Sequence, residues 1–128
     1  MTPNEQCREM LAQWDRGESI WAVEMGGLGP GYEQAIQVLV VEIIRDNIDS
    51  PLPDDSTWRN WGDSTVTRID KRGDDGKWSM GGFSGAQVRA AKNLAYHWLK
   101  EGPDAVNAMD AFKDRKIQVS NHWPRISA

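Results

Sequence analysis

The pattern of hydrophobic and polar residues along the chain predicts helices separated by short strands and turns. The first helix begins within residues 2–5, where threonine, proline and glutamate stand in the order of a capping box. Gly17 follows the last apolar position and supplies a residue that ends the helix. We therefore expect a helix with one face turned to the core, its apolar positions being Cys7, Met10, Leu11 and Trp14.

A strand, a glycine-rich loop and a long helix are predicted next. Two sets of side chains alternate along residues 19–25, which is typical of a strand. Residues 26–31 contain four glycines and a proline, and so predict a sharp loop that is free to adopt positive φ. Residues 32–49 are apolar around most of the helical wheel, which indicates a central helix covered on nearly every side. Because residues 38–44 are rich in β-branched side chains, a strand stays open as the alternative there.

The middle of the chain predicts a connection and a hairpin. Residues 50–64 hold two prolines, several polar turn formers and two tryptophans, and so indicate a long surface connection. Residues 65–72 and 77–80 flank the turn sequence Gly-Asp-Asp-Gly at 73–76. Two short segments around such a turn predict a β-hairpin.

A second capping box opens the last long helix, which we expect over residues 84–101. Ser84 stands at the cap position and Gln87 three residues later. Gly102 ends this helix and Pro103 begins a short one. The apolar face of the short helix is expected to comprise Ala105, Val106, Met109 and Phe112.

The remaining residues complete the expected fold. Residues 115–120 predict a last strand, and residues 121–128 a polar tail. The fold class is therefore α+β: one helix-dominant domain over residues 1–128, with about four helices and a small β-hairpin or sheet.

Composition and charge restrict the partners that this domain is expected to bind. Hydrophobic residues make up 39% and charged residues 27% of the chain, as in globular proteins. No apolar run approaches the roughly 18 residues needed to cross a bilayer, and no secretory signal is recognisable, so we expect a soluble cytoplasmic protein. The net charge is −4, and no Lys/Arg cluster matches a run of phosphates. Direct binding to nucleic acid or membrane is not expected.

The residues that often carry chemistry form no recognisable catalytic or metal-binding motif. Cys7 is the only cysteine and lies on an apolar helix face, which predicts an inert core thiol. His97 and His122 lack the spacing of metal ligands. Asp70 and the aspartates of the 73–76 turn do not match a calcium-binding loop. The sequence thus predicts neither a cofactor nor a metal site, and it favours a protein that is not an enzyme.

Two glycine-rich segments offer an alternative, a site for a small ligand such as a nucleotide or an anion. Each has a strand, then Met-Gly-Gly and an apolar residue, then a helix start, whose free backbone N–H groups suit an anion. Tight turns explain the same pattern, and Tyr32 and Glu33 do not match the known nucleotide-binding loops. Glu24 with Glu33 is a weaker, acid–base interpretation. The residues of this alternative site are Gly26, Gly27, Gly29, Gly31, Tyr32, Glu33, Gln34, Gly81, Gly82, Ser84 and Gln87.

Tryptophan is unusually frequent, with seven in the chain. Trp58 and Trp61 lie in the connection and are the least readily assigned to a core, so they either anchor a partner or hold the loop in place. Trp123 is expected to dock the tail onto the body of the domain. The tryptophans expected on core faces are Trp14, Trp21, Trp78 and Trp98.

The leading functional hypothesis is a small acidic interaction protein that is not catalytic and binds another protein. Short chains without catalytic motifs are common among the accessory proteins and inhibitors that phages encode, and self-assembly into a homo-oligomer is a further possibility. The residues expected to contact the partner are Asp54, Asp55, Trp58, Arg59, Trp61, Asp74 and Asp75.

Overall fold

The computed structural model describes residues 1–23, 30–54, 58–70 and 83–119. The helices and strands of these residues, in chain order, are α1 (Pro3–Asp15), β1 (Ile20–Val23), α2 (Pro30–Asn47), the 3₁₀ turn η1 (Trp58–Asn60), α3 (Asp63–Asp70), α4 (Gly85–Glu101), α5 (Pro103–Asn107) and β2 (Lys116–Val119). The fold is a helix-dominant α+β domain, as predicted.

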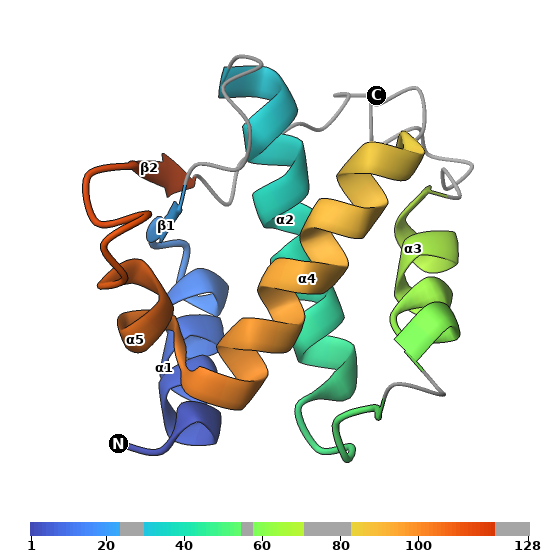
Figure 1. The fold of residues 1–128 in the computed structure, drawn as a ribbon, viewed down its shortest axis with the longest axis horizontal. Coiled ribbons are helices and arrows are strands. Elements are labelled where there is room, and N and C mark those ends of the chain that lie inside the picture. The colour runs from blue at the N-terminus through green and yellow to red at the C-terminus, as the bar shows by residue number, and fades with distance from the viewer. Residues whose placement is uncertain (24–29, 55–57, 71–82, 120–128) are drawn as a thin grey trace.

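Helices α2 and α4 form the centre of the molecule (Figure 1). Figure 1 places α1, α5 and the two strands on one side of this pair, and α3 on the other. The middle of helix α2 is buried, since its side chains from Ala35 to Val41 are each no more than 3% exposed. The central helix predicted here is confirmed, and the alternative of a strand is wrong. A helix that is apolar on every side needs cover all around, which α1, α3, α4 and β2 help to supply.

Both predicted capping boxes are present. The Thr2 hydroxyl accepts a hydrogen bond from the Glu5 backbone N–H at 3.1 Å, and the Glu5 carboxylate accepts one from the Thr2 N–H at 2.9 Å. Ser84 and Gln87 exchange the same two bonds at 3.1 and 3.0 Å. Each pair satisfies two N–H groups that a helix start leaves without partners.

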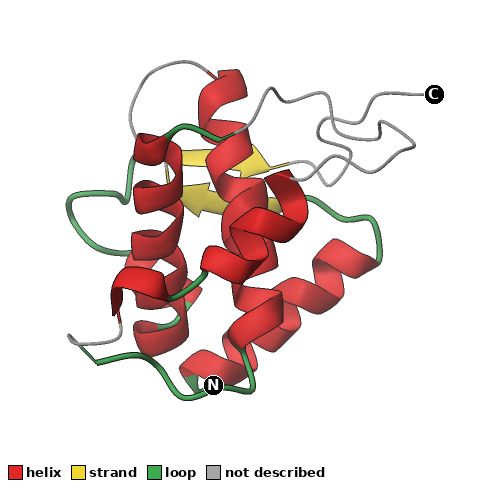
Figure 2. Ribbon diagram, turned by 90° about the vertical axis from the view of Figure 1, so that its right-hand side faces the viewer, coloured by secondary structure: helices red, strands yellow, loops and turns green. Residues whose placement is uncertain are grey.

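The strands β1 and β2 pair antiparallel in a two-stranded sheet, with Ile20 opposite Val119. Figure 2, viewed at a right angle to Figure 1, shows the sheet behind the helices. Ile20 and Ala22 are buried, whereas Trp21, on the opposite side of the pleat, is 56% exposed. The prediction that Trp21 lies in the core is therefore wrong. Side chains alternate between the two faces of a strand, and in this sheet the helices cover only the face that carries Ile20 and Ala22.

The other tryptophans follow the prediction in part. Trp98 is fully buried, and Trp14 is partly buried against the core. Trp78 and Trp123 lie outside the described residues.

The strand predicted at 65–72 is wrong, because residues 63–70 form helix α3. Thr65 and Ile69, four residues apart, are buried on the face toward the core, which is helical spacing. The Thr65 hydroxyl donates to the Asp46 carboxylate of α2 at 2.7 Å. The second strand of the predicted hairpin, with its turn, lies outside the described residues.

The end of the described chain agrees with the sequence in its main elements. Gly102, with a φ of +94°, separates α4 from α5 as predicted. Helix α5 ends at Asn107, so Met109 and Phe112 belong to the turns after it and not to the helix. The last strand is present as β2. Within the described part of the chain, no helix combines the length and apolar character that crossing a membrane requires.

Candidate functional site

The segment predicted to contact a partner is held against α4. The Trp61 ring is partly buried against the core and meets the Tyr96 ring edge to face, with 6.2 Å between centroids. Lys92 is 8% exposed; its ammonium donates to the Arg59 carbonyl at 3.2 Å and pairs with the Asp63 carboxylate. These contacts fix the chain from η1 to the start of α3.

The other residues of that prediction are only partly described. Asp54 and Arg59 are exposed, and Trp58 begins η1. Asp55, Asp74 and Asp75 lie outside the described residues. A partner surface over this segment therefore stays a prediction, with Trp61 facing the core more than sequence alone indicates.

The alternative ligand site is also described only in part. Gly31 and Tyr32 belong to the first turn of α2, where Glu33 is buried and Gln34 partly buried. Ser84 and Gln87 use their side-chain oxygens to cap α4, as given above. Its other members, Gly26, Gly27, Gly29, Gly81 and Gly82, lie outside the described residues. This site too stays a prediction.

Cys7 and His97 lie in very different surroundings. Cys7 is fully buried, its thiol donates to the Trp98 carbonyl at 3.3 Å, and burial raises its pKa to about 12. A thiol in this state is a poor nucleophile. His97 is exposed on α4, with Nδ1 3.7 Å from the Glu101 carboxylate. The described residues include no group of three or more side chains suited to hold a metal ion.

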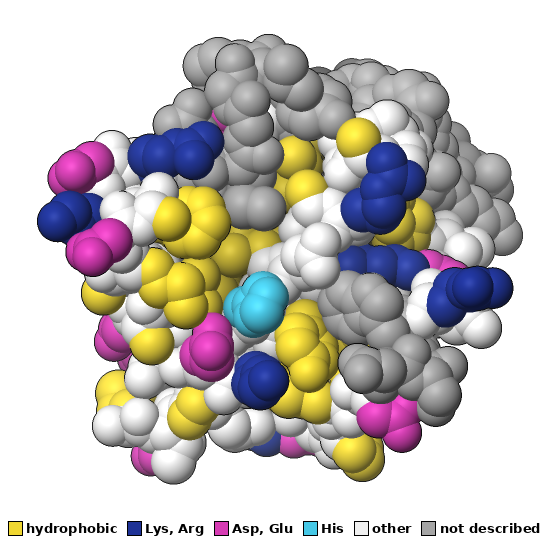
Figure 3. Space-filling model, in the orientation of Figure 1, with side chains coloured by type: hydrophobic (Ala, Val, Ile, Leu, Met, Phe, Trp, Pro, Cys, Tyr) yellow, Lys and Arg dark blue, Asp and Glu magenta, His cyan; other side chains and the backbone are white. Residues whose placement is uncertain are grey.

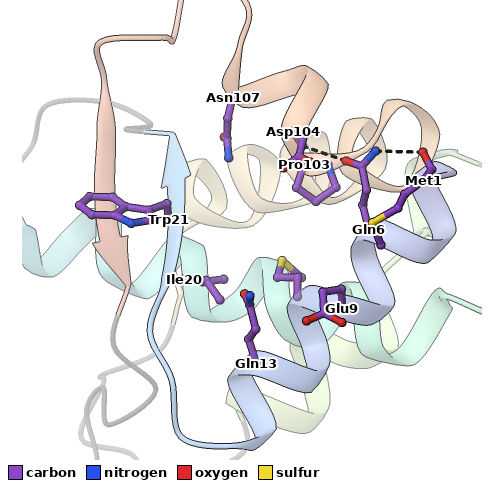
Figure 4. Close-up of a pocket in the computed structure, with 10 residues that line it drawn as sticks. Met1, Gln6, Glu9, Gln13, Ile20, Trp21, Pro103, Asp104 and Asn107 are labelled. Carbon is purple, nitrogen blue, oxygen red and sulfur yellow. Dashed lines mark hydrogen bonds between the residues drawn. The ribbon is translucent and has the colours of Figure 1, made fainter.

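The structure also contains a groove that the sequence does not signal. It lies between α1, β1 and α5 and has a volume of about 310 Å³. Figure 4 shows the side chains of these three elements around it. We call it the α1–β1–α5 groove, and its lining residues are Met1, Gln6, Glu9, Met10, Gln13, Ile20, Trp21, Pro103, Asp104 and Asn107.

One stripe of α1 forms a wall of the groove. Gln6, Glu9, Met10 and Gln13 follow the i, i+3, i+4, i+7 spacing of a helix face. The Gln6 amide is used at both ends: Nε2 donates to the Met1 carbonyl at 3.3 Å and Oε1 accepts from the Asp104 N–H at 3.0 Å (Figure 4). This bond ties α1 to the start of α5 and so fixes two walls of the groove relative to each other.

The opposite wall carries an exposed aromatic ring. Trp21 and Ile20 both line the groove, and Figure 4 shows the Trp21 ring extending from β1 toward β2, on the side of the strand away from Ile20. At the α5 wall, Oδ1 of Asn107 is buried and has no hydrogen-bond partner in the described part of the chain. The groove therefore combines apolar surface with polar and acidic side chains.

No family model, no curated protein and no solved structure matches this chain. The candidate site therefore rests on the geometry of the chain's own residues.

A second, smaller cleft of about 210 Å³ lies between α4 and the turns after α5. Figure 3 shows hydrophobic side chains gathered on this face of the molecule. The lining is almost wholly apolar; its members are Asn93, Leu94, His97, Val106, Met109 and Phe112. It lacks the charged groups and the exposed tryptophan of the α1–β1–α5 groove, which is thus the stronger candidate for recognition.

Proposed function

We propose that the chain is a protein-binding domain that acts without catalysis and holds a segment of a partner protein in the α1–β1–α5 groove. The observation that carries this proposal is Trp21, a residue 56% exposed at the edge of a concave surface. Tryptophan is enriched at the residues that contribute most to protein–protein affinity. A small accessory protein or inhibitor, of the kind that phages encode, would act through such a surface.

The proposal keeps the hypothesis of an acidic interaction protein and gives it a different contact surface. Trp61 is partly buried and packs on Tyr96, so its ring offers less free surface to a partner than Trp21. The groove's volume lies near the lower limit of about 300 Å³ for small-molecule pockets, which suits a few side chains of a partner segment.

The test is to capture a partner, purify it and measure its affinity for variants. The tagged full chain is passed through lysate of its source, and a stoichiometric partner is then identified and purified. Calorimetry compares the wild type with Trp21→Ala, and with Leu52→Ala as the control for losing an exposed apolar side chain outside the groove. We expect Trp21→Ala to weaken binding by at least about tenfold and Leu52→Ala to leave it unchanged.

Equal affinity of the wild type and Trp21→Ala would rule out the groove as the contact surface. Loss of affinity on substituting Trp58 and Trp61 instead would locate the surface at η1. Circular dichroism of each variant shows whether the fold is retained, so that loss of binding is not mistaken for unfolding.

A further inference from the structure

We infer that the α1–β1–α5 groove recognises a positively charged side chain, a lysine or arginine of the partner segment. This inference rests on the proposed function above and adds the chemistry of the group that is recognised. It follows from the charges, the hydrogen bonds and the aromatic ring at the groove.

The charged side chains that line the groove have one sign. They are Glu9 of α1 and Asp104 of α5, and neither lysine nor arginine lines it. Two carboxylates that line the same groove favour a cation there and disfavour an acidic segment, even though Met1, which carries the α-ammonium group, also lines it.

Both carboxylates are available to a ligand. In the described part of the chain, the Asp104 side chain has neither a hydrogen bond nor an ion pair. The Glu9 carboxylate lies 3.9 Å from the Arg16 guanidinium, whose Nε is held by Glu18 at 2.6 Å. Arg16 is therefore mainly the partner of Glu18, and it leaves Glu9 open to a second cation.

The apolar part of the groove suits the aliphatic stem of a lysine or arginine side chain. Lysine and arginine bury an aliphatic stem while the charge stays at a polar surface, and Met10, Ile20 and Pro103 offer such apolar contacts. The indole of Trp21 attracts a cation placed over its face within about 6 Å. A free inorganic cation would gain nothing from these apolar walls, which is why we assign the group to a protein side chain.

The inference is tested with short peptides that differ at one position. The probes are Ac-Gly-Leu-X-Leu-Gly-NH₂ with lysine, arginine, norleucine or glutamate at X; norleucine keeps the stem of lysine and removes its charge. Binding is followed in ¹⁵N-HSQC spectra through the Trp21 indole signal, which is assigned by its loss in Trp21→Phe. We expect the lysine and arginine peptides to bind at least about tenfold more tightly than the norleucine peptide, and the glutamate peptide not to bind.

Matched variants test the residues themselves. Glu9→Gln with Asp104→Asn should remove the preference for lysine over norleucine. Asp110→Asn with Asp114→Asn, which also removes two negative charges but outside the groove, should leave the preference intact. Trp21→Leu keeps apolar contact without the aromatic face, and should weaken the arginine peptide more than the norleucine peptide. Raising salt from about 50 mM to about 500 mM should weaken the lysine peptide selectively.

The outcomes separate this inference from the proposed function. Equal binding of the norleucine and lysine peptides, or no response to either basic peptide, overturns the inference that a cation is recognised. A purified partner that still loses affinity with Trp21→Ala would then leave the proposed function in place. A partner whose affinity is unchanged by Trp21→Ala overturns the proposed function itself.

Discussion

The side-chain oxygen of Gln6 accepts a hydrogen bond at 3.0 Å from the backbone N–H of Asp104, 98 residues later in the chain. Helix α5 has no side-chain cap of its own, because its N-cap is Gly102. Gln6 supplies the missing acceptor from another helix. We expect Gln6→Ala to lower the free energy of unfolding by about 1 kcal/mol, as loss of a cap usually does. Urea unfolding measures this, and faster hydrogen exchange at Asp104 would locate the effect.

A second substitution checks that geometry. A Cβ at Gly102 would lie 2.6 Å from the Gln6 oxygen, and φ there is +94°. Gly102→Ala should thus destabilise the protein through both the contact and the backbone strain. In the Gln6→Ala background only the strain remains, so the second substitution should cost less there. If the effects of Gly102→Ala and Gln6→Ala on the free energy of unfolding were strictly additive, the contact between the new Cβ and the Gln6 side chain would be contradicted.

Cys7 should be protected from thiol reagents in the folded protein. With a pKa of about 12, its thiolate fraction at pH 8 is about 10⁻⁴, and the side chain is fully buried. We expect Ellman's reagent to react at a rate limited by unfolding. Chain unfolded in guanidinium serves as the control and should react at once. Immediate reaction of the native protein would show that Cys7 is accessible.

The ion pair of Asp15 and Arg45 should make stability depend on pH. Arg45 donates two hydrogen bonds to the Asp15 carboxylate, at 2.8 and 3.0 Å, and these lower the pKa of Asp15. The pair therefore stabilises the fold above the pKa of Asp15 in the unfolded chain, and this contribution is lost as pH falls through the lower pKa of the folded state.

The effect is small because solvent screens the pair. We expect Asp15→Asn to lower the free energy of unfolding by about 0.5 kcal/mol at pH 7. The difference from the wild type should shrink as the solution is acidified. Asp114→Asn is the control at pH 7, because no described residue pairs with that exposed carboxylate, and it should leave the free energy of unfolding close to that of the wild type. An Asp15→Asn effect that stays constant down to low pH would contradict the assigned cause.

Lys92 should hold η1 and α3 in place. It is nearly buried, donates to the Arg59 carbonyl and pairs with Asp63. Because Asp63 is half exposed, Lys92→Met should cost about 1–2 kcal/mol rather than the full penalty of breaking a buried pair. Urea unfolding measures the loss. Arg89→Met, at an exposed position of the same helix, should be close to neutral, and equal effects of the two would refute a specific role for Lys92.

Local signals in the sequence correctly predicted much of the fold. Thr2 and Ser84 each stand three residues before a Glu or Gln that completes the cap, so both helix starts could be read from adjacent residues. Gly102 and Pro103 likewise mark a helix end and a helix start in two positions. Signals of this kind need no knowledge of the tertiary structure.

Features that depend on distant neighbours were missed. The β-branched residues of 65–70 favour a strand locally, but burial of Thr65 and Ile69 against α2 selects a helix. The four-residue spacing of Thr65 and Ile69 is a weak local signal for this helix, which the β-branched residues between them outweigh. The α1–β1–α5 groove exists only because Gln6 meets Asp104 and β1 lies beside α1, and no local pattern records these contacts.

The pairing of Ile20 with Val119 also bears on how the protein forms during synthesis. Strand β1 leaves the ribosome early, but its partner follows only after α2 to α5, so the strand waits with open edges that other extended segments can join. Because closing so long a loop costs entropy, we expect the helices to dock first and the sheet last. A truncated chain that ends at residue 115 lacks β2, and protease should cut it within residues 20–23. The full-length chain should resist cleavage there. Premature termination would thus yield a product prone to aggregate, with Trp21 on an unpaired strand.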